Sequence, residues 1–160
     1  MQARGYSLVE MVVIVGIISI LLVIGTLKFR EYFTRYRTES QTRMLFSELQ
    51  RTRANALYQR RATRVKLYAS RFEVYSSKAD CDSGVAPRSS QSLSLPITWS
   101  QNGNNVDFDE NGIASVPRSI CLESCDGAGT VDSVVVHFIR VSVGKKDKGD
   151  LCRGESISIR

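Results

Sequence analysis

An uncharged and strongly apolar stretch, residues 11–27, constrains the fold more than any other feature. Its seventeen residues are mostly Val, Ile and Leu, and its few small residues are of the kind that let helices approach closely in lipid. About twenty apolar residues in a helix span a bilayer, so the stretch is long enough once its apolar neighbours are included. A lone acid, Glu10, precedes it, and a short basic leader ending at Gly5 precedes the acid. We therefore predict an N-terminal membrane anchor.

The anchor differs from an ordinary secretory signal. Such a signal is cut after its apolar core, whereas the plausible cut here, at Gly5, comes before it. The apolar stretch is therefore expected to stay in the mature protein. Glu10 then needs an explanation, because a carboxylate within a membrane costs about 2.5–3.5 kcal/mol on insertion scales. One physical explanation places it at the headgroup level, where the positive end of the helix dipole favours it.

The order of these residues resembles the class III signal of type IV pilins and type II secretion pseudopilins. The resemblance implies that a prepilin peptidase cuts between Gly5 and Tyr6 and methylates the new amine of Tyr6. Glu10 then falls at the fifth mature position, where the family has a conserved glutamate, and pairs with the N-terminal amine of a neighbouring subunit in a filament. The implied segments are a leader at 1–5, a transmembrane helix at 6–27, an amphipathic helix at 28–61 and a β-rich head at 62–160.

Beyond the anchor the helical pattern continues. Apolar residues recur every three or four positions, and neither proline nor glycine occurs between Lys28 and Arg61. This predicts one continuous helix from about Ser7 to Leu57, roughly 75 Å long. Alternating patterns then predict an α+β fold, in which the long helix packs on an antiparallel sheet. Strands are expected at 63–68, 71–75, 93–99, 106–108, 120–122, 134–143 and 156–159, with a loop at 76–92 and turns at 109–112 and 145–149.

Two interior stretches narrow the resemblance to the FimT minor pilins and GspH pseudopilins. Residues 45–57 with 61–67 are similar to the segment of that family that joins the helix to the first strand. Residues 108–114 are similar to its Phe-x-x-x-Gly turn. Together with the leader and anchor, these stretches cover about half of the chain.

Two indicators of membrane topology disagree. Arg4 alone precedes the apolar stretch, whereas Lys28, Arg30, Arg35 and Arg37 follow it closely. By the positive-inside rule, the C-terminal domain would lie in the cytoplasm. The pilin resemblance implies the opposite, an inner-membrane protein with a periplasmic head that later joins a pilus or pseudopilus.

The cysteines favour export. Cys81, Cys121, Cys125 and Cys152 all lie in the distal domain, and an exported domain would pair an even number of cysteines in disulfides. We expect either Cys121 or Cys125 to pair with Cys152 and so to pin the tail to the sheet. A metal site is the weaker alternative, because the Cys121-x-x-x-Cys125 spacing lacks two tight pairs and has no histidine nearby.

The basic residues are concentrated in the helix and first hairpin. From Lys28 to Arg71 there are twelve Lys and Arg residues and three acids. From Phe72 onward there are nine Lys and Arg residues and twelve acids. Two interpretations are open: the arginines bind DNA phosphates in a salt-dependent way, or they contact acids of neighbouring subunits and phospholipid headgroups. These arginines are Arg30, Arg35, Arg37, Arg43, Arg51, Arg53, Arg60, Arg61 and Arg64.

The basic tail is a second candidate for DNA binding. Some FimT-like pilins bind DNA through a Gly-Arg-x-Arg motif in this region, but this chain has only Gly144-Lys145-Lys146 and Cys152-Arg153-Gly154 there. The candidate DNA-binding residues are Lys145, Lys146, Lys148, Arg153 and Arg160.

A catalytic set is not evident. His137 is the single histidine, and we expect it mid-strand in a structural or surface role. The acids at 107–110 are better explained as a hairpin turn than as a calcium site. We expect no enzyme, metal or cofactor. The resemblance implies a structural, priming or adaptor subunit of a type IV pilus or secretion pseudopilus, whose partners are other pilins, the prepilin peptidase, the assembly platform and membrane lipid. The alternative is a membrane- or pilus-tip-anchored DNA-binding pilin in natural transformation.

Overall fold

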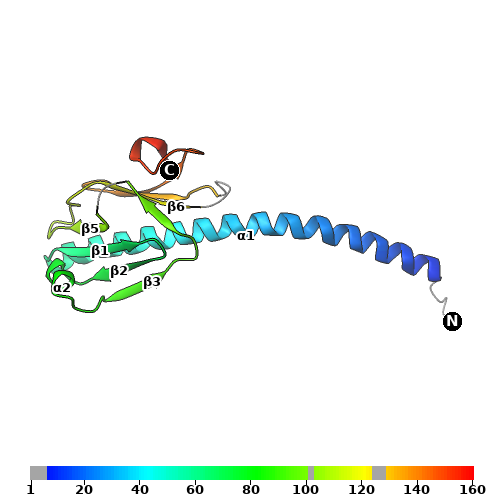
Figure 1. The fold of residues 1–160 in the computed structure, drawn as a ribbon, viewed down its shortest axis with the longest axis horizontal. Helices are drawn as coiled ribbons and strands as arrows, with labels where there is room; N and C mark the ends of the chain where they lie inside the picture. Colours follow the sequence, from blue (N-terminus) through cyan, green and yellow to red (C-terminus); the bar gives the residue numbers. More distant parts are fainter. Residues whose placement is uncertain (1–6, 101–102, 124–128) are drawn as a thin grey trace.

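The computed structural model describes residues 7–100, 103–123 and 129–160. Its longest element is α1 (Leu8–Gln59), a single helix of 52 residues that confirms the predicted helix to within two residues at its C-terminal end. The N-terminal half of α1 projects alone, while the C-terminal half lies along a β-rich head (Figure 1). The helix ends at Arg60, which has a left-handed φ of 48° and whose N–H donates to Ala56 O.

The first sheet has four antiparallel strands in the order β3-β2-β1-β5. The predicted first hairpin is confirmed, with Val65 opposite Val74. The expected loop at 76–92 is partly wrong, because it holds a short helix and the edge strand β3. That strand is made of Ser and Gln and pairs through its backbone alone, so no alternation reveals it. The elements are β1 (Thr63–Tyr68), β2 (Arg71–Tyr75), α2 (Lys78–Asp82), β3 (Ser89–Ser92) and β5 (Asn105–Phe108).

The second sheet has five antiparallel strands in the order β4-β6-β7-β8-β9. The predicted strand at 134–143 is wrong as a single strand. The chain reverses at residues 137–140, where the His137 N–H donates to Arg140 O, and His137 is therefore exposed in a turn. The elements are β4 (Ile97–Trp99), β6 (Arg118–Leu122), β7 (Ser133–Val136), β8 (Val141–Lys146), the 3₁₀ helix η1 (Gly154–Ser156) and β9 (Ile157–Ile159).

Two further boundaries differ from the predictions. The strand expected at 93–99 is reduced to β4, because the chain at Ser94 and Leu95 hydrogen-bonds to the Gln41 side chain instead of to a strand. Lys145 and Lys146 end β8, so the charged turn begins only at Asp147.

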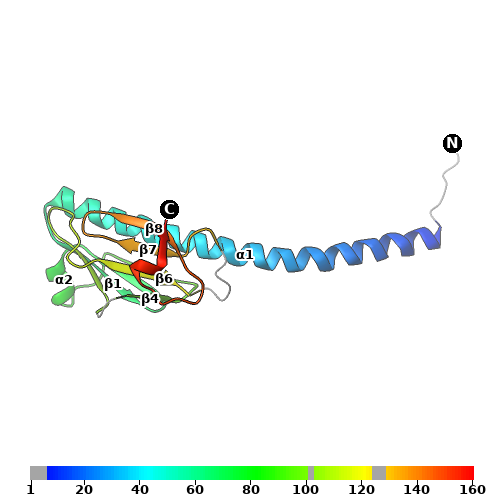
Figure 2. The ribbon, with the colours of Figure 1, turned by 90° about the horizontal axis from the view of Figure 1, so that it is seen from above.

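The core lies between the C-terminal half of α1 and both sheets (Figures 1 and 2). Leu45, Leu49 and Ala56 are fully buried there, at the spacing that predicted an inward face. The predicted turn at 109–112 is also confirmed: the Asp109 carboxylate accepts the backbone N–H groups of residues 111 and 113. Gly112 has a φ of 66°, and a Cβ there would lie 2.7 Å from Leu57, so this turn requires glycine.

Candidate assembly and binding sites

The N-terminal half of α1 is the first candidate site. Among the described residues α1 is the one helix long and apolar enough to cross a membrane. Its most apolar 18-residue window has a mean hydropathy of 2.9, and none of that window is buried by the rest of the chain. Positions 16 and 25 are glycines, and apart from the adjacent residues and the local helix backbone no atom lies within 4 Å of where a Cβ would stand. They leave shallow notches at which another helix can approach. This half therefore presents an apolar surface that its own chain does not cover.

Glu10 lies in the first turn of α1 and is exposed. The N-cap residue, Ser7, makes no side-chain hydrogen bond to this turn. The free N–H groups of a first turn favour a carboxylate beside them. Gly5 and Tyr6, the predicted cleavage and methylation site, lie outside the described residues.

The arginines of the basic segment have different environments. Arg64 is buried, donates to both carboxylate oxygens of Asp107 at 2.7 and 2.9 Å, and contacts Asp82 at 2.5 Å. Its hydrogen bond to Asp107 raises the pKa of the guanidinium. Arg53 donates to the carbonyl oxygen of Gly112 at 2.9 Å. These two arginines therefore stabilise the head, and the DNA-binding interpretation fails for Arg64 because it is buried among its acid partners.

Four of the five candidate DNA-binding residues in the tail line one open cavity of about 250 Å³: Lys145, Lys146, Lys148 and Arg160. Asp147 and Ser158 complete its lining. Lys145 Nζ donates to Gly129 O at 2.9 Å, and the adjacent Thr130 is bound to Glu39 of α1. The cavity therefore lies at the end of the head nearest the projecting half of α1. The fifth candidate, Arg153, precedes η1 and does not line the cavity.

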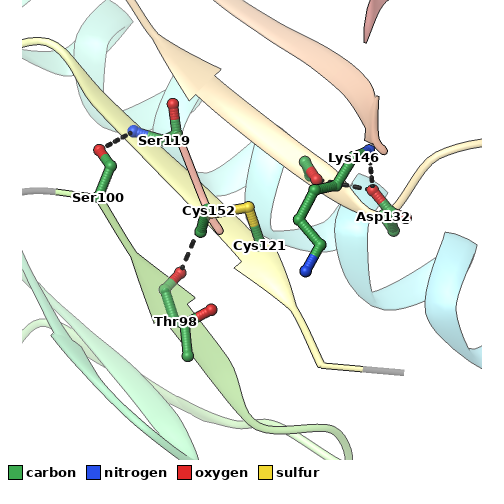
Figure 3. The surroundings of a disulfide bond; sticks show 8 residues. Thr98, Ser100, Ser119, Cys121, Asp132, Lys146 and Cys152 are labelled. Carbon is green, nitrogen blue, oxygen red and sulfur yellow. Dashed lines mark hydrogen bonds between the residues drawn. A yellow bond between two sulfur atoms is a disulfide. The ribbon is translucent and has the colours of Figure 1, made fainter. Parts of the chain in front are cut away.

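A disulfide joins Cys121 of β6 to Cys152 in the tail (Figure 3). It confirms the predicted link between the tail and the sheet, and Cys152 Sγ lies 3.7 Å from the carbonyl oxygen of Thr98 on β4. The prediction that Cys81 is disulfide-bonded is wrong: it is a free thiol on α2, which packs on the first sheet, whereas the disulfide belongs to the second. Cys125 lies outside the described residues.

Two polar side chains of α1 that the sequence analysis missed fix loops to the helix. Gln41 accepts the N–H groups of Ser94 and Leu95 and donates to Leu95 O at 2.7 Å. Glu39 Oε1 accepts both the N–H and the hydroxyl of Thr130 at 2.6 Å, and these hydrogen bonds lower the pKa of Glu39. For Gln41 the signal was present, since Thr38 and Gln41 are buried and extend the inward face of Leu45 by about two turns.

Metal binding and catalysis gain no support. In the part of the chain that the structure describes, no three His, Cys, Asp or Glu side chains are grouped so that they could hold a metal ion. His137 lies in the exposed turn between β7 and β8. Two of the three acids at 107–110 are engaged elsewhere, since Asp107 binds Arg64 and Asp109 holds its own turn.

No protein-family model and no curated protein sequence matches the chain. Among solved structures it is similar to the type IV minor pilin FimU of Pseudomonas aeruginosa strain PAO1, at 18% identity and a TM-score of 0.52 over 70% of this chain and 91% of that one. A second crystal form of FimU matches at 18% identity and a TM-score of 0.49 over 66% and 90% of the two chains. At this identity the likeness shows the fold, a long N-terminal helix packed on antiparallel sheets. The chain has the type IV pilin fold.

Proposed function

We propose that this chain is a minor pilin or pseudopilin, a structural, priming or adaptor subunit of a type IV pilus or a type II secretion pseudopilus. One observation carries the proposal: a single helix has one half packed in the head and the other half apolar and exposed. Such a surface needs an apolar partner. Lipid is that partner before assembly, and the equivalent helices of neighbouring subunits are the partner in a filament.

The proposal includes processing and export. A prepilin peptidase removes residues 1–5 and methylates Tyr6, and the head lies in the periplasm, where its disulfide forms. The Glu10 carboxylate then pairs with the N-terminal amine of a neighbouring subunit. In a low-dielectric filament core an unpaired carboxylate is costly, so this pairing favours one register between subunits.

The experiment that tests assembly replaces Glu10 in the full-length chain. Glu10→Ala should leave membrane insertion unchanged and abolish incorporation into filaments, because the neighbouring amine loses its partner. Incorporation is measured in sheared filament fractions. The matched control is Glu31→Ala, another exposed acid of α1 that lies beyond the apolar half. Normal incorporation of the Glu10 variant would contradict the pairing.

Processing is tested separately by mass spectrometry of the protein taken from its membrane. We expect the mass of residues 6–160 plus one methyl group. A variant with Gly5→Glu should retain the leader, because it replaces the residue after which the proposed peptidase cuts. An intact leader in the unaltered protein would favour a permanently anchored binding protein over a filament subunit.

A DNA-binding role is the second candidate function, and the basic cavity is the observation that favours it. Lys148→Gln with Arg160→Gln removes two cations from the cavity; Lys78→Gln with Arg140→Gln removes two exposed cations elsewhere on the head. If the cavity binds DNA phosphates, the first pair should lower the slope of log affinity against log salt by roughly two, and the control pair should not. Equal, small effects of both pairs would exclude the cavity as a DNA site.

A further inference from the structure

The neck, residues 28–37, joins the apolar half of α1 to the half packed in the head. It carries four exposed aromatic side chains: Phe29 (67%), Tyr32 (67%), Phe33 (42%) and Tyr36 (61%). At 3.6 residues per turn these four lie on one side of the helix, opposite the face through which Thr38 and Leu45 enter the head. The aromatic side therefore lies away from the face of α1 that enters the head; only Tyr36, nearest the head, borders an open cavity that Ser92 and Ser94 also line.

Cations flank the aromatic side on both edges. Lys28 and Arg35 lie along one edge and contact Glu31 at 3.8 and 2.6 Å. Arg30 and Arg37 lie along the other edge, and the Arg37 guanidinium stands 4.3 Å from the centre of the Phe33 ring. Four cations therefore surround the aromatic rings, with a single acid among them.

The position of the neck along the helix matches a membrane interface. The seventeen uncharged residues before it span about 26 Å as a helix, short of the roughly 30 Å of a hydrocarbon core. The rings of Phe29 and Phe33 stack with centroids 6.1 Å apart and extend the apolar length by more than one turn. Tyrosines are enriched at the headgroup level of membrane proteins, where Tyr32 and Tyr36 would then lie.

We propose that the neck binds the phosphates of anionic phospholipids in the leaflet from which the head emerges. The flanking cations contact the phosphates, and the aromatic rings fill the boundary between headgroups and acyl chains. The inference rests on the proposed insertion of α1 into the membrane.

Charge favours lipid over a second copy of the chain. Two necks packed face to face would bring eight cations together with only two acids, whereas an anionic leaflet complements them. The same binding explains why the cations stand on the exported side, against the positive-inside rule.

The test uses the full chain in vesicles of phosphatidylcholine and phosphatidylglycerol. Tyr36→Trp with Trp99→Phe places a single tryptophan in the neck, and its fluorescence is quenched by bromine carried on one lipid or the other. We expect brominated phosphatidylglycerol to quench more than brominated phosphatidylcholine at equal mole fraction. The preference for phosphatidylglycerol, measured as this excess of quenching, should fall when Arg30→Gln and Arg37→Gln are added. We expect a decrease of roughly fivefold per cation removed, the equivalent of about 1 kcal/mol each.

The matched control is Arg51→Gln with Arg60→Gln, which removes two exposed cations from the far end of the same helix and should leave the excess unchanged. Equal quenching by the two lipids, whatever the charge of the neck, would overturn the inference and leave insertion intact. Protection from both lipids in vesicle-bound protein would mean that another copy covers the neck, which also overturns it. A chain that fails to float with vesicles would instead refute the membrane anchoring in the proposed function.

Discussion

The two halves of α1 share one unbroken backbone and have opposite surroundings. From Leu8 to Ile24 the large apolar side chains are exposed, whereas Leu45, Leu49 and Ala56 are fully buried by the head. Backbone hydrogen bonds hold both halves equally, so the helix itself does not distinguish them. The difference lies in what covers the side chains: the chain's own sheets in one half, and a partner of apolar chemistry in the other.

The comparison also separates two kinds of sequence. In the packed half, apolar residues occupy one face and alternate with charges, as expected for a helix on a sheet. In the projecting half, Val, Ile and Leu occupy every face, as expected for a helix surrounded by lipid or by other helices. The head should therefore keep its stability when the projecting half is altered, and the predictions below test this separation.

The largest expected effect comes from truncating a packed leucine. Leu49→Ala should destabilise the head by roughly 3–5 kcal/mol, because it removes a fully buried side chain and leaves a cavity. Leu21→Ala, on the exposed half, should change the stability of the head by less than about 0.5 kcal/mol. Urea unfolding of the full chain in detergent, followed by the fluorescence of Trp99, measures both. Similar losses from the two variants would show that the halves are not independent.

Reduction of the disulfide should have the next largest effect. The bridge between Cys121 and Cys152 closes a loop with a sequence separation of 31, so its removal is expected to cost about 3 kcal/mol. Cys121→Ser with Cys152→Ser, followed by thermal melting, measures this cost without a reductant. Far-ultraviolet circular dichroism should still show the projecting helix after the head has melted. Simultaneous loss of all helical signal would contradict the separation of the halves.

A buried arginine should matter more to the head than an exposed one. Arg64→Gln leaves the Asp107 carboxylate largely buried without its partner, and we expect a loss of about 2 kcal/mol. Arg30→Gln, which removes a cation from the neck, should leave the stability of the head unchanged. Chemical unfolding curves of the two variants under identical conditions distinguish them. Equal denaturant concentrations at half unfolding would mean that the Arg64 network makes no net contribution to the stability of the head.

The sequence predicted α1 well because its signals are local and repeated. A long apolar stretch, a helical period without proline or glycine between Lys28 and Arg61, and a change to alternation at Thr63 each point to one interpretation. The first hairpin and the turn at Asp109 were equally accessible, since side-chain alternation and turn chemistry determine them.

The missed features depend on contacts that no local pattern encodes. The apolar run from Val134 to Val143 contains no turn residue, yet it reverses because β7 and β8 both bury their side chains against α1. Strand β3 has no apolar residue at all and exists through backbone pairing with β2. The free thiol of Cys81 follows from its place on α2, which packs on the first sheet, whereas the disulfide lies at the second; the cysteine count could not reveal this. In the tail, the four cations that share a cavity were identifiable by charge, but their proximity required the β8–β9 pairing.

The smallest predicted effect concerns pH and the boundary between the two halves. Glu39 is bound to Thr130 at the point where α1 enters the head, and these hydrogen bonds lower the pKa of its carboxyl. Because the pKa is lower in the folded than in the unfolded state, the contribution is present above the ordinary carboxyl pKa and is lost as pH falls through the folded pKa. Glu39→Gln should therefore lower stability by less than about 1 kcal/mol at neutral pH and have no effect in acid.

Glu31→Gln is the control for this last prediction, because Glu31 contacts only neck cations on its own helix among the ion pairs of the described residues. Its stability should follow that of the unaltered protein across the acid range. Hydrogen exchange at Thr130 provides a second readout: its amide should exchange faster in Glu39→Gln at neutral pH, and the difference from the unaltered protein should shrink as the carboxyl is protonated. If the exchange rates of the Thr130 amide still differ in acid, packing and not the carboxylate holds this loop to α1. The head would then meet the projecting half without an electrostatic contact at their boundary.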